Sequence, residues 1–258
     1  MRFNRALLIN LYYKESGYGD RLNFPPVGLG YLSQYLEREN IAHDVIDTGA
    51  GLNEDDVFQK VKLFDPELLA FSLNSICFPR SLVLIAKLKK NFPNVAIVIG
   101  GPHASTKQAA LLKENATIDF VIVKEGEIPL ALLCKGEELG NIPGLIWRDK
   151  DKIIRSNGLK RLNINEFPYP LYRNFELSKN YNSGTIGIVT SRGCPFECAF
   201  CQQSSLLGKD WRSRTAASVI EEIEHWYNKG IASVHILDDN FGLDKKRIFE
   251  IADLLEQR

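Results

Sequence analysis

Residues 185–201 read TIGIVTSRGCPFECAFC, and this stretch decides how the rest of the chain is interpreted. Its β-branched run, Ile186–Thr190, predicts a strand. The strand leads into Cys194, Cys198 and Cys201, which have three and then two residues between them. The chain has five cysteines, and an odd total with three close together argues against a disulfide framework. The pattern indicates a metal site in a reducing compartment.

The cysteine spacing suits an iron–sulfur cluster. A loop of this kind can curl around one face of a [4Fe–4S] cluster and supply three sulfurs to three irons. Such a cluster ordinarily has four cysteine ligands, but the other two cysteines, Cys77 and Cys134, lie far upstream. We therefore predict that Cys194, Cys198 and Cys201 are the ligands and that one iron stays open to a substrate. Cys77 and Cys134 are predicted to be small buried apolar residues.

Zinc is the main alternative metal, because Cys198 and Cys201 form a CxxC pair. Structural zinc sites usually combine such a pair with a second CxxC or an HxxxH. This region has one pair and an extra cysteine four residues earlier. Three free thiols in a turn are a further alternative.

The motif CxxxCxxC after a strand, with Phe200 before the last cysteine, resembles the radical S-adenosylmethionine (SAM) superfamily. The following segments WRSR, VIEEIEHWYNKGI and VHILDDNFG are similar to the branch that carries an N-terminal cobalamin-binding domain. PPVGLGYLSQYLE, GGPHAS and VKEGE resemble the first domain of that branch. The resemblance covers essentially the whole chain and is tightest over residues 186–201.

The resemblance assigns SAM-binding roles to four residues. It places Phe200 against the adenine, and it places Asp238, Asp239 and Asn240 near the SAM amino group at the end of the second barrel strand. A helix N-cap before Lys245 or a solvated turn is the alternative for the three polar residues. Two arginines nearby, Arg212 and Arg214, are candidates for the SAM carboxylate or a substrate acid, or for a solvated helix start.

Upstream of the cysteine loop, apolar runs alternate with segments of helical period. The expected strands are Ala6–Leu11, His43–Asp47, Leu68–Ser72, Val95–Ile99 and Phe120–Val123. The expected helices are Gly28–Glu39, Glu54–Phe64, Ser81–Asn91 and Lys107–Asn115. This alternation predicts an α/β fold with a flavodoxin-like (Rossmann-type), doubly wound parallel sheet. A hairpin is expected at Gly144–Ile154.

Small and polar residues follow three of these strands, where a ligand crevice is expected in such a sheet. Glycines there would let a flat ligand or a phosphate approach the backbone. The candidates are Ser72, Asn74, Ser75, Gly100, Gly101, His103, Glu125, Gly126 and Glu127. The residues alone are compatible with a nucleotide, a corrin or no ligand, and the resemblance implies cobalamin.

Related cobalamin domains place a histidine under cobalt from the loop after the first strand. The corresponding loop here, NLYYKESGYGDRLNFPP, contains no histidine. We therefore expect a cobalt without a histidine ligand from this loop. His103 is expected to bond a corrin amide or the backbone, with axial ligation as the alternative.

Two more helices, Ala216–Lys229 and Lys245–Gln257, flank a strand at Ser233–Leu237. The resemblance makes this region the start of a partial (β/α) barrel, and a complete barrel needs on the order of 200 or more residues. We therefore expect a fragment of a longer protein, without a complete active site of its own. The expected division is a cobalamin-binding-like domain at residues 1–157, a linker at 158–180 and a truncated barrel at 181–258.

Composition limits the partners. Lys+Arg and Asp+Glu both total 32, so nothing in the charge favours a nucleic acid. No apolar run reaches the ~18 residues that a membrane span needs. We expect a cytoplasmic protein.

The resemblance implies a cobalamin-dependent radical SAM enzyme. In that family an external electron donor of the flavodoxin or ferredoxin type reduces the cluster, and SAM is cleaved to methionine and a 5′-deoxyadenosyl radical. The radical removes hydrogen from an unactivated carbon, and in methylating members methylcobalamin supplies a methyl group. The alternatives are a radical rearrangement or cyclisation without a corrin, and a non-catalytic cluster- or cobalamin-binding module.

Overall fold

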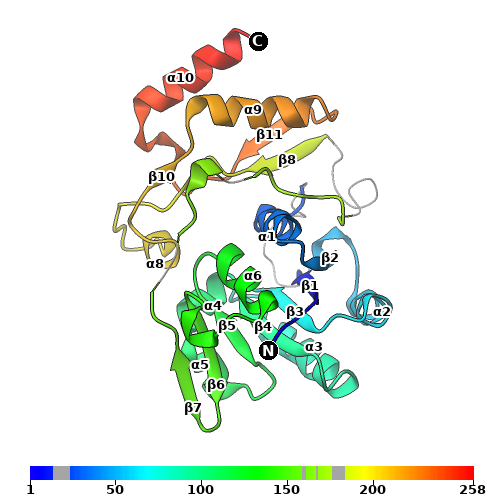
Figure 1. Ribbon diagram of the computed structural model, residues 1–258. Helices are drawn as coiled ribbons and strands as arrows, with labels where there is room; N and C mark the ends of the chain where they lie inside the picture. Colours follow the sequence, from blue (N-terminus) through cyan, green and yellow to red (C-terminus); the bar gives the residue numbers. More distant parts are fainter. Residues whose placement is uncertain (14–23, 159–160, 167, 176–183) are drawn as a thin grey trace.

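A mostly parallel sheet forms the first part of the protein (Figure 1). The structure is a computed structural model that describes residues 1–13, 24–158, 161–166, 168–175 and 184–258. The strands are β1 (Arg5–Asn10), β2 (Ala42–Asp47), β3 (Leu68–Ser72), β4 (Ala96–Gly100), β5 (Phe120–Ile122), β6 (Leu145–Asp149) and β7 (Lys152–Arg155). They lie in the order β2-β1-β3-β4-β5-β6-β7, with β6 and β7 antiparallel. The first five strands have the flavodoxin-like order, so the predicted fold and the predicted hairpin are confirmed.

Helices cover both faces of this sheet. They are α1 (Val27–Arg38), α2 (Glu54–Phe64), α3 (Phe78–Asn91), α4 (Pro102–Lys107), α5 (Ala109–Glu114) and α6 (Glu127–Lys135). Successive side chains of a strand point to opposite faces. Accordingly, Leu8 of β1 belongs to the apolar cluster under α1 and α6, whereas Leu7 belongs to the cluster under α2, α3 and α5.

Three helix predictions differ from the structure. The expected helix Lys107–Asn115 begins only at Ala109, as α5, because Gln108 has a left-handed φ of 52°; Lys107 ends a separate helix, α4, that was not predicted. The helix α3 begins at Phe78 rather than Ser81, with a proline in its first turn, where the missing N–H costs nothing. The helix α6 was not predicted, since its sequence EIPLALLCK is apolar almost all round and shows no helical period.

The second part contains two small sheets (Figure 1). Its elements are β8 (Thr185–Ile188), β9 (Ser191–Arg192), α8 (Gln203–Leu206), β10 (Arg212–Ser213), α9 (Ala216–Tyr227), β11 (Ser233–Ile236) and α10 (Lys245–Glu256). β8 pairs with β11 in parallel, and β9 pairs with β10 in antiparallel. The strands β8 and β11 and the helices α9 and α10 confirm the predicted β/α alternation, whereas β9, α8 and β10 were not predicted.

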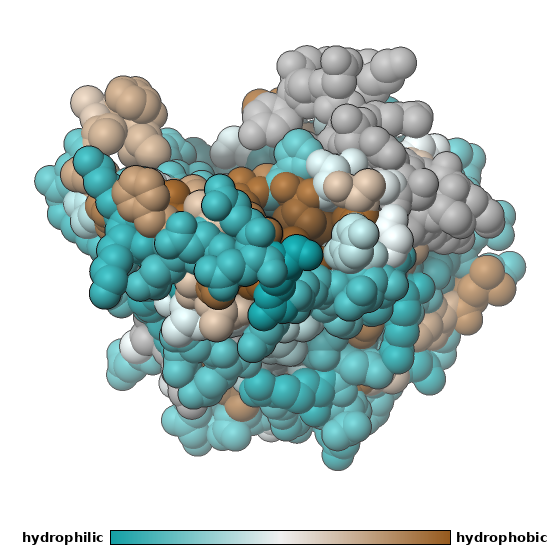
Figure 2. Space-filling model, turned by 90° about the horizontal axis from the view of Figure 1, so that it is seen from above, coloured by the Kyte–Doolittle hydropathy of each residue, from teal (hydrophilic) through white to brown (hydrophobic). Residues whose placement is uncertain are grey.

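Within the described residues β11 pairs with β8 alone, so its other edge is open. Ile236 and Leu237 at its end are 37% and 38% exposed. Seen from the α9–α10 end, apolar surface is visible among hydrophilic side chains (Figure 2). No helix in the described ranges is long and apolar enough to cross a lipid bilayer.

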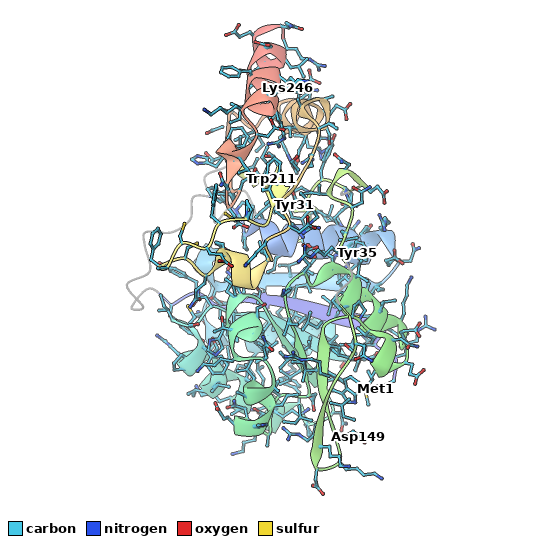
Figure 3. All side chains as sticks on the ribbon, turned by 90° about the vertical axis from the view of Figure 1, so that its left-hand side faces the viewer. Met1, Tyr31, Tyr35, Asp149, Trp211 and Lys246 are labelled. Carbon is cyan, nitrogen blue, oxygen red and sulfur yellow. The ribbon has the colours of Figure 1, made fainter. Side chains whose placement is uncertain are left out.

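The helix α1 contacts both parts. Its Gly30 accepts a hydrogen bond from the Leu171 N–H at 2.9 Å. Its Tyr31 hydroxyl lies 3.4 Å from the nitrogen and 3.5 Å from the oxygen of Val189, at the junction of the two parts (Figure 3). One apolar cluster runs from Leu36 of α1 to Ile188 of β8. The two parts are therefore packed against each other through side chains and are not joined by the chain alone. The proposed division at residues 157 and 180 stays a prediction.

We expect Gly30→Ala to destabilise the protein, because an added Cβ would lie 2.6 Å from the Tyr172 ring and 2.8 Å from Pro170. Such overpacking typically lowers the free energy of unfolding by about 1–3 kcal/mol. The matched control is Gly28→Ala, whose Cβ meets nothing within 4 Å and should stabilise the helix by up to ~1 kcal/mol. Urea denaturation followed by circular dichroism measures both, and equal midpoints would contradict this account of Gly30.

Candidate active site

A cavity of about 330 Å³ lies at the carboxyl edge of the parallel sheet, between the two parts of the chain. Six of the predicted first-domain residues line it: Ser72, Gly100, Gly101, Glu125, Gly126 and Glu127. The helix α1 contributes Val27, Gly28, Leu29, Tyr31 and Leu32. The opposite wall consists of residues around the cysteine loop: Val189, Ser191, Arg192, Gln203, Leu206, Leu207, Leu237 and Asp239. This is the place where doubly wound sheets bind ligands.

The two glycines at the end of β4 let neighbouring backbone lie close to the edge of the sheet. Gly101 has a φ of 89°, and a Cβ there would lie 2.9 Å from both the nitrogen and the oxygen of Leu73. Only glycine fits such a position without strain. The next strand end turns through Lys124, whose φ is 67° and whose N–H donates to the Ser105 hydroxyl at 2.8 Å. This turn directs Glu125 and Glu127 toward the second part.

The other three predicted first-domain residues do not line the cavity. Asn74 accepts a hydrogen bond from the Cys77 N–H at 2.8 Å, before α3. The Ser75 hydroxyl lies 2.9 Å from His103 Nδ1, and the His103 ring stacks on Phe78 at 4.0 Å. Burial lowers the pKa of His103, which favours the neutral imidazole. The structure thus gives these residues local contacts, and their role toward cobalamin stays a prediction.

Glu125 and Glu127 form ion pairs with two arginines of the second part. Arg192 Nη2 lies 2.8 Å from Glu127 Oε1, and Arg212 pairs with Glu125. Burial alone would lower the pKa of Arg192, but the charge of Glu127, its hydrogen bond and the charge of Glu125 outweigh this and raise it. Arg212 is therefore not a solvated helix start, since its side chain is 16% exposed and paired with Glu125.

Asp238 and Asp239 are adjacent but differ in role. Asp238 accepts hydrogen bonds from the Thr190 N–H at 2.6 Å, the Thr190 hydroxyl at 2.5 Å and the Ser191 hydroxyl at 2.6 Å. Asp239 lines the cavity and, among the residues that the structure describes, accepts one bond, from the Gly193 N–H at 3.3 Å. Burial, together with the charge of Asp238, raises the pKa of Asp239.

Neither alternative for this acidic segment holds. The N-cap of α10 is Asp244, which accepts from the Arg247 N–H at 3.1 Å, and Asp238 is bonded to Thr190 and Ser191 after β8 rather than solvated. Arg214 is also neither a SAM ligand nor solvated. Its side chain is 2% exposed and pairs with Glu222, which is 0% exposed, so the pair is a structural element under α9.

The cysteine loop lies at the edge of this site. Cys194 is half-buried, whereas Cys198 and Cys201 are exposed. Asn240 Nδ2 is 3.9 Å from Cys194 Sγ, and Phe200 is 91% exposed, away from the cavity lining. Within the described ranges no three His, Cys, Asp or Glu side chains are grouped closely enough to hold a metal ion. The ligand set therefore stays a prediction from the spacing.

The loop nevertheless fits a three-thiolate cluster by its chemistry. Its three sulfurs are local in sequence, and two are accessible to incoming iron. Gly193, directly before Cys194, has a φ of 86°, and a Cβ there would collide with the Asp210 carbonyl oxygen. Cys77 and Cys134 are each 1% exposed, which confirms their predicted burial.

Two protein families match this chain. Residues 21–133 match the B12 binding domain, and residues 188–258 match the Radical SAM superfamily. The chain belongs to the radical SAM proteins that carry a B12 binding domain. The family resemblance read from the cysteine loop and the strand ends is therefore confirmed.

Relatives share this arrangement over most of the chain. An uncharacterized methyltransferase of Pyrococcus horikoshii is 37% identical, over 90% of this chain and 52% of its own length. An anaerobic magnesium-protoporphyrin IX monomethyl ester cyclase of Cereibacter sphaeroides is 25% identical, over 96% of this chain and 43% of its own. The structure of the cobalamin-dependent SAM radical enzyme OxsB, with aqua-cobalamin and SAM bound, superimposes with a TM-score of 0.83 at 20% identity, over 99% of this chain and 37% of that one. This chain thus spans about half of the curated relatives or less.

Sequence reasoning missed several residues of this radical SAM protein's cavity. Tyr31 and Leu32 of α1 line the cavity. The helical period of PPVGLGYLSQYLE predicts the helix in which they lie, but it does not predict the contact of this helix with Val189. Arg192 directly precedes Gly193 and Cys194 in the motif, so its place beside the loop could be read from the sequence. The pairing of Arg192 with Glu127 could not be read from the sequence.

We expect Asp239→Asn to stabilise the protein at about pH 7.5. A carboxyl group whose pKa is raised on folding stabilises the folded state at low pH, and this contribution is lost as pH rises through the raised pKa. The neutral Asn avoids that loss, so its advantage over the wild type should shrink as pH falls through the raised pKa of Asp239.

The matched substitution is Asp238→Asn, which leaves fewer acceptors for three donors and should lower the free energy of unfolding by about 1.5–3 kcal/mol. Urea midpoints across this pH range measure both variants. Shifts of the same sign at about pH 7.5 would show that the two carboxyl groups do not differ as described.

Proposed function

We propose that this chain is part of a cobalamin-dependent radical SAM enzyme that methylates an unactivated carbon. The observation that carries the proposal is the shared cavity. Its first wall is the carboxyl edge of the B12 binding domain, and its second wall is built by residues that flank the cysteine loop. Two cofactors held by the two domains would therefore face one shared cavity.

The cofactor assignments follow from this arrangement. Cys194, Cys198 and Cys201 would hold a [4Fe–4S] cluster, and Asp239 and Asn240 would bind SAM, with Asp238 holding their segment in place. Phe200 would bind the adenine, as the family resemblance implies. Cobalamin would lie along the first wall, formed by Ser72, Gly100, Gly101, Glu125, Gly126 and Glu127, with Asn74, Ser75 and His103 behind it. When bound, these groups supply reductive cleavage of SAM and methyl transfer.

The protein's own residues provide positioning and a dry space. Leu29, Leu32 and Leu206 make much of the lining apolar, which excludes water from reactive species. The Asp239 carboxylate faces this space with one protein hydrogen bond, so it has acceptor capacity left for an ammonium group. Gly28 leaves open space on the α1 side, where a side chain would intrude on a bound ligand.

Radical cyclisation is a second candidate reaction, because the cyclase of Cereibacter sphaeroides aligns with 96% of this chain. SAM with a labelled methyl group distinguishes the two reactions in the complete protein under reducing conditions. Label in the product supports methylation, and 5′-deoxyadenosine without label transfer supports cyclisation. No SAM cleavage would leave a non-catalytic binding module.

The proposal also includes a compartment and a partner. Two exposed thiols in a cluster loop require reducing surroundings, which the cytoplasm provides. An electron donor of the flavodoxin or ferredoxin type would deliver electrons at the exposed side of the loop.

We expect anaerobic reconstitution with iron and sulfide to give about four irons per chain, the content of one [4Fe–4S] cluster. Replacing Cys194, Cys198 or Cys201 by Ala should abolish uptake, because each supplies a sulfur. The controls are Cys77→Ala and Cys134→Ala, which remove buried thiols outside the loop and should leave uptake unchanged. Iron and absorbance assays measure this, and stoichiometric zinc without iron would refute the cluster.

We expect the chain to bind hydroxocobalamin without a histidine–cobalt bond. His103 Nδ1 already lies beside Ser75, and the ring does not line the cavity. The electron paramagnetic resonance spectrum of the cob(II)alamin form should therefore lack nitrogen superhyperfine splitting from the protein. His103→Ala should leave this spectrum unchanged. Splitting that disappears in His103→Ala would assign His103 as the axial ligand.

A further inference from the structure

The cysteine loop begins and ends at two arginines that face one another. Arg192 lies in β9 and Arg212 in β10, and the two residues are register partners in the antiparallel pair. The loop between them contains Cys194, Cys198 and Cys201. Whatever holds these two arginines therefore holds both ends of the loop.

Both arginines are held from the B12 binding domain. Arg192 Nη2 lies 2.8 Å from Glu127 Oε1, and Arg192 Nη1 lies 3.8 Å from Glu125 Oε2. Arg212 Nη2 bonds Glu125 Oε1, and Arg212 Nη1 donates to the Leu162 carbonyl at 2.9 Å. The four charged side chains are between 5% and 16% exposed, so salt screens them little.

The contact links one turn in the first domain with both ends of the loop. The two glutamates are two residues apart at the turn from β5 into α6, and Lys124 takes a left-handed conformation directly before them. A non-glycine residue in that conformation is strained and persists where the surroundings require it. Elsewhere on this boundary, Arg173 and Glu37 pair at 2.5 Å, but they are 56% and 38% exposed.

We propose that Glu125 and Glu127 are positioning residues that clamp the two ends of the cysteine loop against the B12 binding domain. The loop can then hold its iron site at the cavity only while the domains are docked. The effect of the clamp on iron binding rests on the proposed iron–sulfur site. The clamp itself is a property of the protein without iron.

The test uses the whole chain with Glu125→Gln, Glu127→Gln and both together. The matched control is Glu37→Gln, which removes an ion pair on the same boundary away from the loop. The first measurement is the rate of tryptic cleavage after Lys209, whose side chain is 61% exposed within the loop, in iron-free protein. The second is the rate at which a chelator removes iron from reconstituted protein. Circular dichroism and urea midpoints check that each variant is folded.

We expect cleavage after Lys209 and iron loss to be about tenfold faster in the clamp variants, which corresponds to about 1.4 kcal/mol of local opening. Glu37→Gln should match the wild type in both rates. Adding Arg192→Gln to Glu127→Gln should cause little further change, because the two residues act through one another. A cleavage rate in the double glutamate variant equal to that of Glu37→Gln would overturn the clamp.

The two measurements separate this inference from the proposed function. Faster cleavage with no iron uptake even by the wild type would support the clamp and refute the iron–sulfur site. Normal iron uptake with unchanged cleavage and unchanged iron loss would support the cluster and refute the clamp. If the variants unfold, Arg192→Lys keeps the charge, and wild-type rates there with faster rates in a folded Arg192→Gln would still support the clamp.

Discussion

The close approach of α1 to the second part of the chain is the constraint on which the site depends. Gly30 has no side chain, so Pro170 and Tyr172 can lie against the helix backbone. At the next residue of the helix, the Tyr31 hydroxyl lies within 3.5 Å of the nitrogen and the oxygen of Val189, directly after β8 and shortly before the cysteine loop. A bulkier residue at position 30 would move the helix away from Pro170 and Tyr172. The cavity exists at its observed width because one helix serves both parts.

Charge adds direction to this packing. An apolar contact between two layers tolerates small slides, whereas a buried ion pair with its hydrogen bonds is satisfied in one arrangement. Glu127 with Arg192 and Glu125 with Arg212 supply that arrangement at the domain boundary. Arg214 with Glu222 does the same inside the second part, where it links α9 to the segment that follows β10. Since such pairs gain little net stability over apolar packing, their place around the loop suits a positioning role better than a stabilising one.

Much of the fold was predictable because its signals are local. The strands β3 and β4 are continuous apolar runs, and α2 shows a capping box at Asn53, so sequence and structure agree there. The break at Gln108 and the helix α6 were not predictable, since the first depends on a backbone angle set by tertiary contacts and the second lacks an amphipathic period. The site divides in the same way. Strand-end glycines follow from topology, but the choice between Asp238 and Asp239 depends on which carboxylate meets Thr190.

That last choice shows how one strand end serves two purposes. Asp238 uses both oxygens on Thr190 and Ser191 and so joins the ends of β11 and β8, the two strands that carry the site. Asp239, one residue later and beyond the end of β11, lines the cavity, and burial raises its pKa. The Asp238 carboxylate holds the two strand ends together. The Asp239 carboxylate is partly desolvated and faces the cavity, where a cationic group of a ligand would stabilise its charge. An acceptor with spare capacity beside a fully bonded neighbour is what a pre-organised binding pocket requires.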